Sequence, residues 1–186
     1  DFAWAQPVPA DSAKELNVGL SKLNEEIANL RASNVKQRDV ADVEVFAKGV
    51  EWCLRHDEFY SNNKKPDAPS GWVKYCEAAI ATGTQRAAEL KAGQTPWSRM
   101  IGSTIRGYVS RVDGSTQPYA VSMPAGFGDA KSGFRFPLHV KLHGRGGTRN
   151  EVRFFNEHQG KKPQDGQNWI QLDVFGRTDN AYRWSG

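Results

Sequence analysis

The sequence lacks a long hydrophobic run: no stretch approaches the roughly eighteen apolar residues that a membrane-spanning helix needs. We therefore expect a soluble chain with no membrane span. Internal repeats and low-complexity segments are missing as well, so a repeat architecture is not expected. The composition, 38% apolar and 25% charged over 186 residues, is that of a globular protein with one medium domain or two small ones.

Two glycine motifs of nucleotide-binding proteins are absent. A phosphate-binding loop needs G-x-x-x-x-G-K-[ST], and no Lys-Ser or Lys-Thr follows the glycines at 144, 146 and 147. A dinucleotide fingerprint needs G-x-G-x-x-G, and the same glycines have the wrong spacing. These absences argue against nucleotide-binding proteins of both classes, and the sequence predicts no cofactor.

Cysteine is scarce, because Cys53 and Cys76 are the only two in the chain. Both fall in the half for which helices are predicted below. If their helices are antiparallel neighbours, the two thiols lie near the connecting loop and can form a disulfide, which would stabilise the fold by roughly 3 kcal/mol. Two buried free thiols are the alternative, and the sequence leaves both open.

Charge is unevenly distributed along the chain. Residues 1–95 hold 12 Lys and Arg against 14 Asp and Glu, and residues 96–186 hold 13 against 7, a net charge of +6. The cations of the second half are scattered, with only Lys161 and Lys162 adjacent, so we expect solvated surface or an anionic substrate rather than nucleic acid. The chain begins at Asp1, and Ala3-Trp4-Ala5 resembles the end of a signal peptide, which leaves secretion to the periplasm or beyond open.

The first half shows the apolar periodicity of helices between residues 12 and 92. Ser12 and Glu15 have the spacing of a capping box, Asp39 is a candidate cap for the second helix, and Gly93 ends the third. The apolar stripes of the three helices are Leu16, Leu20, Leu23, Ile27 and Leu30; Val43, Phe46, Val50 and Cys53 or Leu54; and Trp72, Tyr75, Cys76, Ala79, Ile80, Ala87 and Leu90. Each stripe needs a partner, so we expect a helical bundle or cap over residues 1–95.

The second half reads as a hairpin followed by strand, helix and strand. The four predicted strands and the helix before the last of them are Thr104–Val112, Gln117–Met123, Phe136–Leu142, Arg149–His158 and Trp169–Phe175. We therefore predict an α/β fold class: about three N-terminal helices, then antiparallel strands that give way to parallel ones in an incomplete sheet over residues 96–186.

The third predicted strand ends in His143-Gly144-Arg145-Gly146-Gly147. Glycines let the backbone adopt positive φ and approach a ligand without a Cβ in the way. A tight turn of this kind leaves successive N–H groups free to bind an oxyanion. A purely structural glycine turn is the alternative. His139 and His143 do not form a metal pair, because four residues along a strand separate them by about 13 Å, and no metal site is predicted.

These residues resemble the α/β-hydrolases, in which a strand followed by His-Gly supplies oxyanion-hole N–H groups. The resemblance is carried by residues 140–147 (VKLHGRGG), the hairpin residues 106–124, and the end of the chain from Asp173 (DVFGR) to Trp184. It covers roughly residues 100–186. In particular, these three segments, taken in their order along the chain, are similar to those of secreted bacterial prolyl-oligopeptidase-like serine hydrolases that carry a helical region in front.

The resemblance implies an enzyme that cleaves ester or peptide bonds. The backbone N–H of Arg145, with that of Gly146, would face the oxyanion of a small ester or peptide substrate. His143, Gly144 and Gly147 would support the turn, since the family's catalytic histidine comes near the C-terminus. Arg177 and Arg183 would line the cleft, or form surface ion pairs.

One departure from the family is serious, because G-x-S-x-G, the motif of its nucleophile, occurs nowhere in the sequence. The chain is therefore expected to be the N-terminal portion of a hydrolase, inactive by itself, whose partner is the C-terminal remainder of the same enzyme. The alternative from another class is a non-catalytic binding or assembly module with a basic surface.

Overall fold

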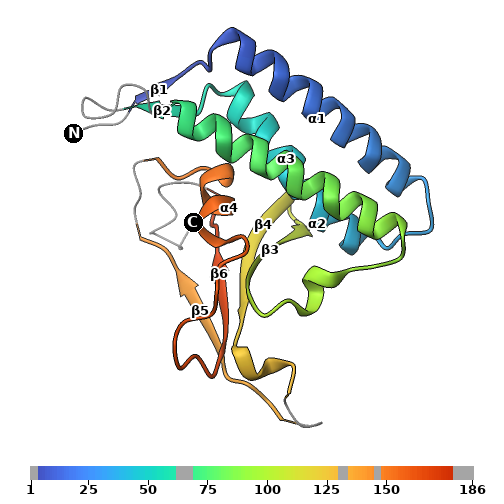
Figure 1. Ribbon diagram of the computed structural model, residues 1–186, viewed down its shortest axis with the longest axis vertical. Helices are drawn as coiled ribbons and strands as arrows, with labels where there is room; N and C mark the ends of the chain where they lie inside the picture. Colours follow the sequence, from blue (N-terminus) through green and yellow to red (C-terminus); the bar gives the residue numbers. More distant parts are fainter. Residues whose placement is uncertain (1–3, 62–68, 130–133, 145–147, 178–186) are drawn as a thin grey trace.

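The structure, a computed structural model, describes residues 4–61, 69–129, 134–144 and 148–177. In Figure 1 the three long helices lie together at the top and the larger sheet extends below them, with α4 beside its upper end. The elements in chain order are β1 (Trp4–Gln6), α1 (Ala10–Arg31), α2 (Gln37–Arg55), β2 (Phe59–Ser61), α3 (Pro69–Lys91), the 3₁₀ turn η1 (Pro96–Arg99), β3 (Gly102–Val109), β4 (Thr116–Met123), the 3₁₀ turn η2 (Ala125–Phe127), β5 (Leu138–Leu142), α4 (Glu151–His158) and β6 (Ile170–Val174).

The long helices bury the apolar stripes that the sequence shows. In α1 the four leucines and the isoleucine of the stripe are buried, and Val43, Phe46, Val50 and Cys53 of α2 are buried in the same core. The two predicted N-terminal caps are wrong. Helix α1 begins at Ala10 with Pro9 at the N-cap, and Asp39 lies inside the first turn of α2. The fixed φ of proline is compatible with a helix start, so α1 begins before Ser12.

The larger sheet has the strand order β3-β4-β6-β5. β3 and β4 form an antiparallel hairpin from Gly102↔Met123 to Val109↔Thr116. β6 lies antiparallel to β4 and parallel to β5, with Leu172 opposite both Val121 and Val140. β5 therefore lies at one edge of this sheet and β3 at the other.

The predicted fold class, an α/β protein with three helices followed by the antiparallel and then parallel strands of an α/β-hydrolase sheet, is wrong. The described residues form four helices and two sheets, of which β1 and β2 make a separate antiparallel pair. Among the described strands β5 and β6 are the one parallel pair, and β6 lies between β4 and β5. Helices gathered at one end of a mostly antiparallel sheet are an α+β arrangement. Three-residue strands carry no readable alternation, and periodicity does not report which strands pair.

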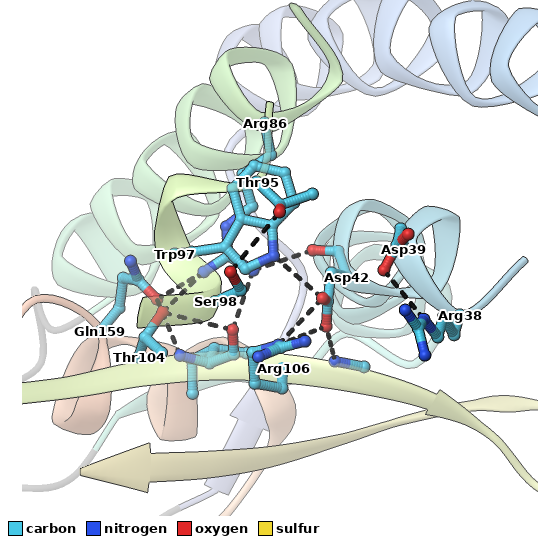
Figure 2. Close-up of polar contacts among 12 residues, drawn as sticks. Arg38, Asp39, Asp42, Arg86, Thr95, Trp97, Ser98, Thr104, Arg106 and Gln159 are labelled. Carbon is cyan, nitrogen blue, oxygen red and sulfur yellow. Dashed lines mark hydrogen bonds and ion pairs between the residues drawn. The ribbon is translucent and has the colours of Figure 1, made fainter. Parts of the chain in front are cut away.

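Helix α2 packs directly against β3. A Cβ on Gly107 would lie 2.0 Å from the carbonyl oxygen of Ala41, so only glycine allows the helix to come this close. The neighbouring Asp42, 1% exposed, accepts hydrogen bonds from Gly107 N at 2.7 Å, Arg106 Nε at 2.9 Å and Trp97 Nε1 at 2.9 Å (Figure 2). One carboxylate thus joins α2 to η1 and to the outer edge of β3.

Arg86 of α3 completes this contact. Its guanidinium donates to the carbonyl oxygens of Asp42 at 3.0 Å and Ile105 at 2.8 Å, and it lies 4.9 Å from the ring centre of Trp97. Burial lowers the pKa of Arg86 to about 10. Gln159 accepts from Ile105 N at 2.9 Å, so side chains satisfy the edge of β3 where another strand would otherwise pair (Figure 2).

The opposite edge of the sheet is different, because every residue of β5 is exposed. Leu138, Val140 and Leu142 are 60%, 53% and 52% exposed. They share one face of the strand, since side chains alternate, while Lys141 and its register partner Asp173 lie on the other. His158 of α4 lies 4.0 Å from Asp173, so α4 contacts β6 on that second side.

The hydrophobic core is a single cluster that includes residues from both 1–95 and 96–186. Ring contacts cross between the two ranges, as in Phe46 and Phe155 with ring centres 5.0 Å apart. Among the described residues, none of the helices has both the length and the apolar character to cross a lipid bilayer.

Candidate functional site

The candidate site lies where the two parallel strands end. β5 ends at Leu142 and is followed by the His-Gly-Arg-Gly-Gly sequence of residues 143–147, and β6 ends at Val174 and leads into Phe175. In open α/β sheets ligands bind outside the carboxyl ends of parallel strands, and β5 and β6 are the parallel pair of this mostly antiparallel sheet. We therefore expect a ligand-binding site at the loops that follow β5 and β6.

A pocket of about 310 Å³ lies beside the end of β6, between helix α2, the start of α4 and the β3–β4 hairpin loop. Its walls come from residues that are distant in sequence. They are Lys48, Trp52, Glu58, Asp113, Ser115, Gln117, Arg149, Asn150, Glu151, Phe175 and Arg177. Most of the lining side chains are polar or charged, so the pocket is suited to a polar ligand.

An ion pair between Lys48 and Glu151 forms one wall. Lys48 Nζ lies 2.5 Å from Glu151 Oε1, and only 10% of the glutamate side chain is exposed. Burial raises the pKa of Glu151 to about 7, although the attraction of Lys48 acts in the opposite direction. The second oxygen, Oε2, is buried and has no hydrogen-bond partner among the described residues. With a pKa of about 7, the carboxyl of Glu151 is protonated in a substantial fraction of the molecules at neutral pH.

Asn150 fixes the start of α4 at the same wall. Its Oδ1 accepts from Arg153 N at 3.0 Å, which is an N-cap, and its Nδ2 donates to the carbonyl oxygen of Glu58 at 3.1 Å. One side chain therefore caps the helix that follows the glycine turn and ties it to the segment after α2.

Arg177 closes the pocket from the end of β6. Its guanidinium donates to Asp113 Oδ2 at 2.6 Å and to Ser110 Oγ at 2.8 Å, so it binds the hairpin loop. These bonds, with those from Ser115, hold the pKa of Asp113 below its usual range. Arg177 has φ of 68°, in the left-handed region, and a non-glycine residue there is often held for function.

His143 lies between the two strand ends. Its Nε2 is 2.6 Å from the carbonyl oxygen of Phe175, and its Nδ1 is 2.7 Å from that of Gly144. A neutral imidazole has one N–H, so only one of these contacts is a hydrogen bond unless the ring is protonated. The contact with Phe175 joins the first residue of the turn to the end of β6.

The remaining predicted site residues fall elsewhere. Arg145, Gly146, Gly147 and Arg183 lie outside the described residues. Among the described residues no atom lies within 4 Å of the place where a Cβ on Gly144 would be. Cys53 and Cys76 are free thiols, both buried between α2 and α3.

The pocket's own chemistry is acid–base rather than nucleophilic. Ser115 supplies its only hydroxyl among the described lining residues, and that hydroxyl donates to Asp113 Oδ1 at 2.7 Å. No histidine lines this pocket in the described part of the chain, so Ser115 lacks a base that would activate it. Nor do the described residues group three or more His, Cys, Asp or Glu side chains where a metal ion would fit.

Sequence reasoning missed the wall formed by Lys48, Trp52 and Glu151. Lys48 and Trp52 lie on the polar side of the α2 stripe, where charged and aromatic side chains are common and carry no signal. Glu151 stands in the first turn of a helix, which is the ordinary place for an acid. Only the packing of α2 against α4 brings the three together.

Comparisons with known proteins identify no relative of this chain. No protein-family model matches it, and neither the curated proteins nor the solved structures give a significant match.

Proposed function

We propose that this chain is part of a serine hydrolase that cleaves ester or peptide bonds, and that the turn after β5 binds the oxyanion. The observation that carries the proposal is the polar pocket beside the carboxyl end of β6, where Phe175 and Arg177 line it. It adjoins the strand that ends in the His-Gly-Arg-Gly-Gly sequence of residues 143–147. The resemblance of residues 100–186 to secreted prolyl-oligopeptidase-like hydrolases gives the same substrate class.

The chemistry assigned to the turn is electrostatic. When a nucleophile attacks the carbonyl carbon of an ester or amide, the carbonyl oxygen gains negative charge. The N–H groups of Arg145 and Gly146 would donate to that oxygen, and glycine lets the backbone approach it closely. Helix α4 begins at Glu151, soon after the turn, and the partial positive charge of a helix N-terminus favours an anion nearby.

The nucleophile must come from another segment, because G-x-S-x-G is absent from these 186 residues. β5 offers a place for that segment. Among the described residues it pairs only with β6, and its residues are exposed. A further strand that pairs with β5 can present a serine at the carboxyl end of the sheet, beside the pocket. We also propose export from the cytoplasm, on the Ala3-Trp4-Ala5 sequence.

The test uses the chain joined to the sequence encoded downstream of it. We expect this longer protein to react with a fluorophosphonate probe and to hydrolyse p-nitrophenyl esters, whereas the 186-residue chain does neither. Arg145→Pro removes the proposed N–H donor and should lower kcat by about 10² to 10³. Arg145→Ala changes the side chain but keeps the N–H, so it is the matched control and should retain activity.

A second candidate function, a non-catalytic binding or assembly module with a basic surface, rests on two observations. Residues 96–186 carry a net charge of +6, and β5 exposes three large apolar side chains. This alternative predicts that the 186 residues fold alone and bind an anionic polymer such as heparin in a salt-sensitive way. A folded longer protein without fluorophosphonate labelling would refute the hydrolase, and salt-sensitive heparin binding would then support the module.

A further inference from the structure

A second pocket adjoins the candidate site. It has a volume of about 460 Å³ and lies between α1, α2 and the loop that joins β3 to β4. The two pockets share Lys48, Trp52 and Ser115 as lining residues, so they form one continuous groove. This groove runs from α1 across Trp52 to the start of α4 and the end of β6. A ligand that fills it must therefore be extended.

Trp52 gives the middle of the groove a large apolar surface. The residue belongs to α2 and is 42% exposed. His56, which is not among the described residues that line the groove, stacks on the indole with ring centres 4.7 Å apart. Lys48 Nζ lies 5.9 Å from the centre of the same indole. These contacts hold the ring in place, so it is an oriented aromatic platform that both pockets share.

The charged side chains of the groove are matched in sign. Three ion pairs lie within it, and they are Arg31 with Glu44, Lys48 with Glu151, and Arg177 with Asp113. The other charged lining residues are Glu51, which lies 3.9 Å from Arg55, and Glu58 and Arg149, which have opposite signs. A cleft attracts a charged ligand when charges of one sign line it. The balance found here favours a neutral ligand.

The hydroxyl groups of the groove have already used their hydrogen atoms. Thr116 Oγ1 donates to Glu44 Oε2 at 2.7 Å, and Ser115 Oγ donates to Asp113 Oδ1 at 2.7 Å. A hydroxyl group has one hydrogen, whereas hydroxyl and carboxylate oxygens keep lone pairs after such bonds. The groove is therefore rich in acceptors and suited to a ligand that supplies many hydrogen-bond donors.

The walls lack the surfaces that commonly recognise peptides. An extended peptide pairs with the open edge of a sheet, and an amphipathic helix needs an apolar groove. The edges of the larger sheet are β3 and β5, and neither contributes to the described lining of the groove, which is mostly polar or charged. An oligosaccharide fits better, because it is extended, can be neutral, carries many hydroxyl donors and packs its C–H groups on aromatic rings.

We propose that the groove across Trp52 binds a neutral oligosaccharide, with one sugar ring on the indole and hydroxyl groups that donate to the acceptors on both sides. Binding needs no catalysis. The proposal rests on the proposed function only for the reaction, in which the bond that is cleaved would be an ester carried by the saccharide. The acyl C–O bond breaks, water supplies OH to the acyl carbon and H to the sugar oxygen, and the products are a carboxylic acid and a free sugar hydroxyl.

The experiment titrates the 186-residue chain with xylohexaose, cellohexaose and mannohexaose by isothermal titration calorimetry, at low and at high NaCl. We expect at least one of them to bind with a Kd of about 1 mM or tighter, and more tightly than its disaccharide, because only the longer sugar reaches both pockets. The affinity should not depend on salt, since these sugars carry no charge. Heparin and an uncharged hexapeptide of alanine and glycine are the comparison ligands.

Variants locate the binding site. Trp52→Ala should weaken binding about tenfold or more, because tryptophan is frequent among the residues that dominate binding energy, whereas Trp52→Phe keeps an aromatic ring and should retain most of the affinity. Phe134→Ala is the matched control, since Phe134 is 62% exposed, precedes β5 and is not among the described lining residues. Asn24→Ala, at an exposed position of α1 in the second pocket, should also lower the affinity for the hexasaccharide. This second variant leaves the core intact, so the test does not depend on whether Trp52→Ala folds.

Four outcomes overturn the proposal. They are no binding of any of the three hexasaccharides, equal affinity of Trp52→Ala and Phe134→Ala, tighter binding of the peptide than of the sugars, and binding of heparin alone that is lost at high salt. The last of these would support the module with a basic surface. Fluorophosphonate labelling has no bearing on any of the four, so a chain that binds sugar without labelling of the longer protein would refute the hydrolase and leave this proposal standing.

Discussion

At the scale of single residues, Glu151 shows how burial and charge compete in the candidate site. Its carboxyl is nearly enclosed and has one ionic partner, Lys48, at 2.5 Å, while the other oxygen is without a partner among the described residues. The cost of burying the charged form exceeds the attraction of Lys48, so the pKa of Glu151 is raised to about 7. The acid therefore opposes folding when it is ionised.

This raised pKa predicts a pH dependence of stability. The folded protein holds the Glu151 proton between pH 4.5 and about 7, whereas the unfolded chain releases it, so stability falls as pH rises through this window. A shift of this size corresponds to about 3 kcal/mol. Glu151→Gln should remove this part of the slope, which urea unfolding from pH 4 to 8 measures. Glu157→Gln, at the exposed end of α4, is the control, and equal profiles for Glu151→Gln and wild type would contradict the prediction.

At the scale of elements, the two edges of the larger sheet differ in how far other residues cover them. The edge of β3 is closed by Asp42, Arg86 and Gln159, whose side chains bond to its backbone. The edge of β5 has exposed aliphatic side chains on one face. An exposed apolar edge strand is a site of pairing or aggregation unless another segment covers it.

This exposure predicts that β5 governs association of the chain. Val140→Lys places a charge in the middle of the apolar row, and because Val140 is 53% exposed the free energy of unfolding should change by less than about 0.5 kcal/mol. Sedimentation velocity should show concentration-dependent association of the wild-type chain that this variant reduces. Val112→Lys is the control, since Val112 is 92% exposed in the hairpin loop. If both variants associate as the wild type does, β5 is not the contact.

At the scale of the whole molecule, the helices and the sheet behave as one body. They share one hydrophobic cluster, and the buried carboxylate of Asp42 links α2 to Trp97 and to Arg106 of β3 (Figure 2). Breaking such a link by removing one partner leaves the other groups buried and unpaired, which is strongly destabilising. The contacts that Asp42 makes between the helices and the sheet should therefore control the stability of both.

Asp42→Ala tests these contacts between the helices and the sheet. We expect a loss of about 3–5 kcal/mol in the free energy of unfolding, because the N–H of Gly107, the indole of Trp97 and the guanidinium of Arg106 lose their acceptor. Far-UV circular dichroism, which reports the helices, and tryptophan fluorescence should shift together in urea. Asp39→Asn, one turn earlier and with its side chain 22% exposed, should cost less than about 1 kcal/mol. Separate transitions for the two probes would show that the helices unfold independently.

The sequence alone determined the positions of the long helices and of the main strands. The stripe from Leu16 to Leu30 recurs every three or four residues, and such a run can bury one face only as a helix. The predicted return strand from Gln117 to Met123 lies within β4, and Gly93, with φ of 73°, follows the end of α3 as expected. These features are local, and local periodicity and turn chemistry report them.

The tertiary structure decided what no local pattern reports. The position of β6 between β4 and β5, the three-residue pairing of β1 with β2, and the contact of Lys48 with Glu151 across 103 residues depend on chain segments that meet only after folding. The fold class was mistaken for this reason, and of the residues that line the candidate pocket only Arg177 had been predicted as a site residue. Periodicity fixes which face of an element is buried, whereas packing between distant elements fixes what that face meets.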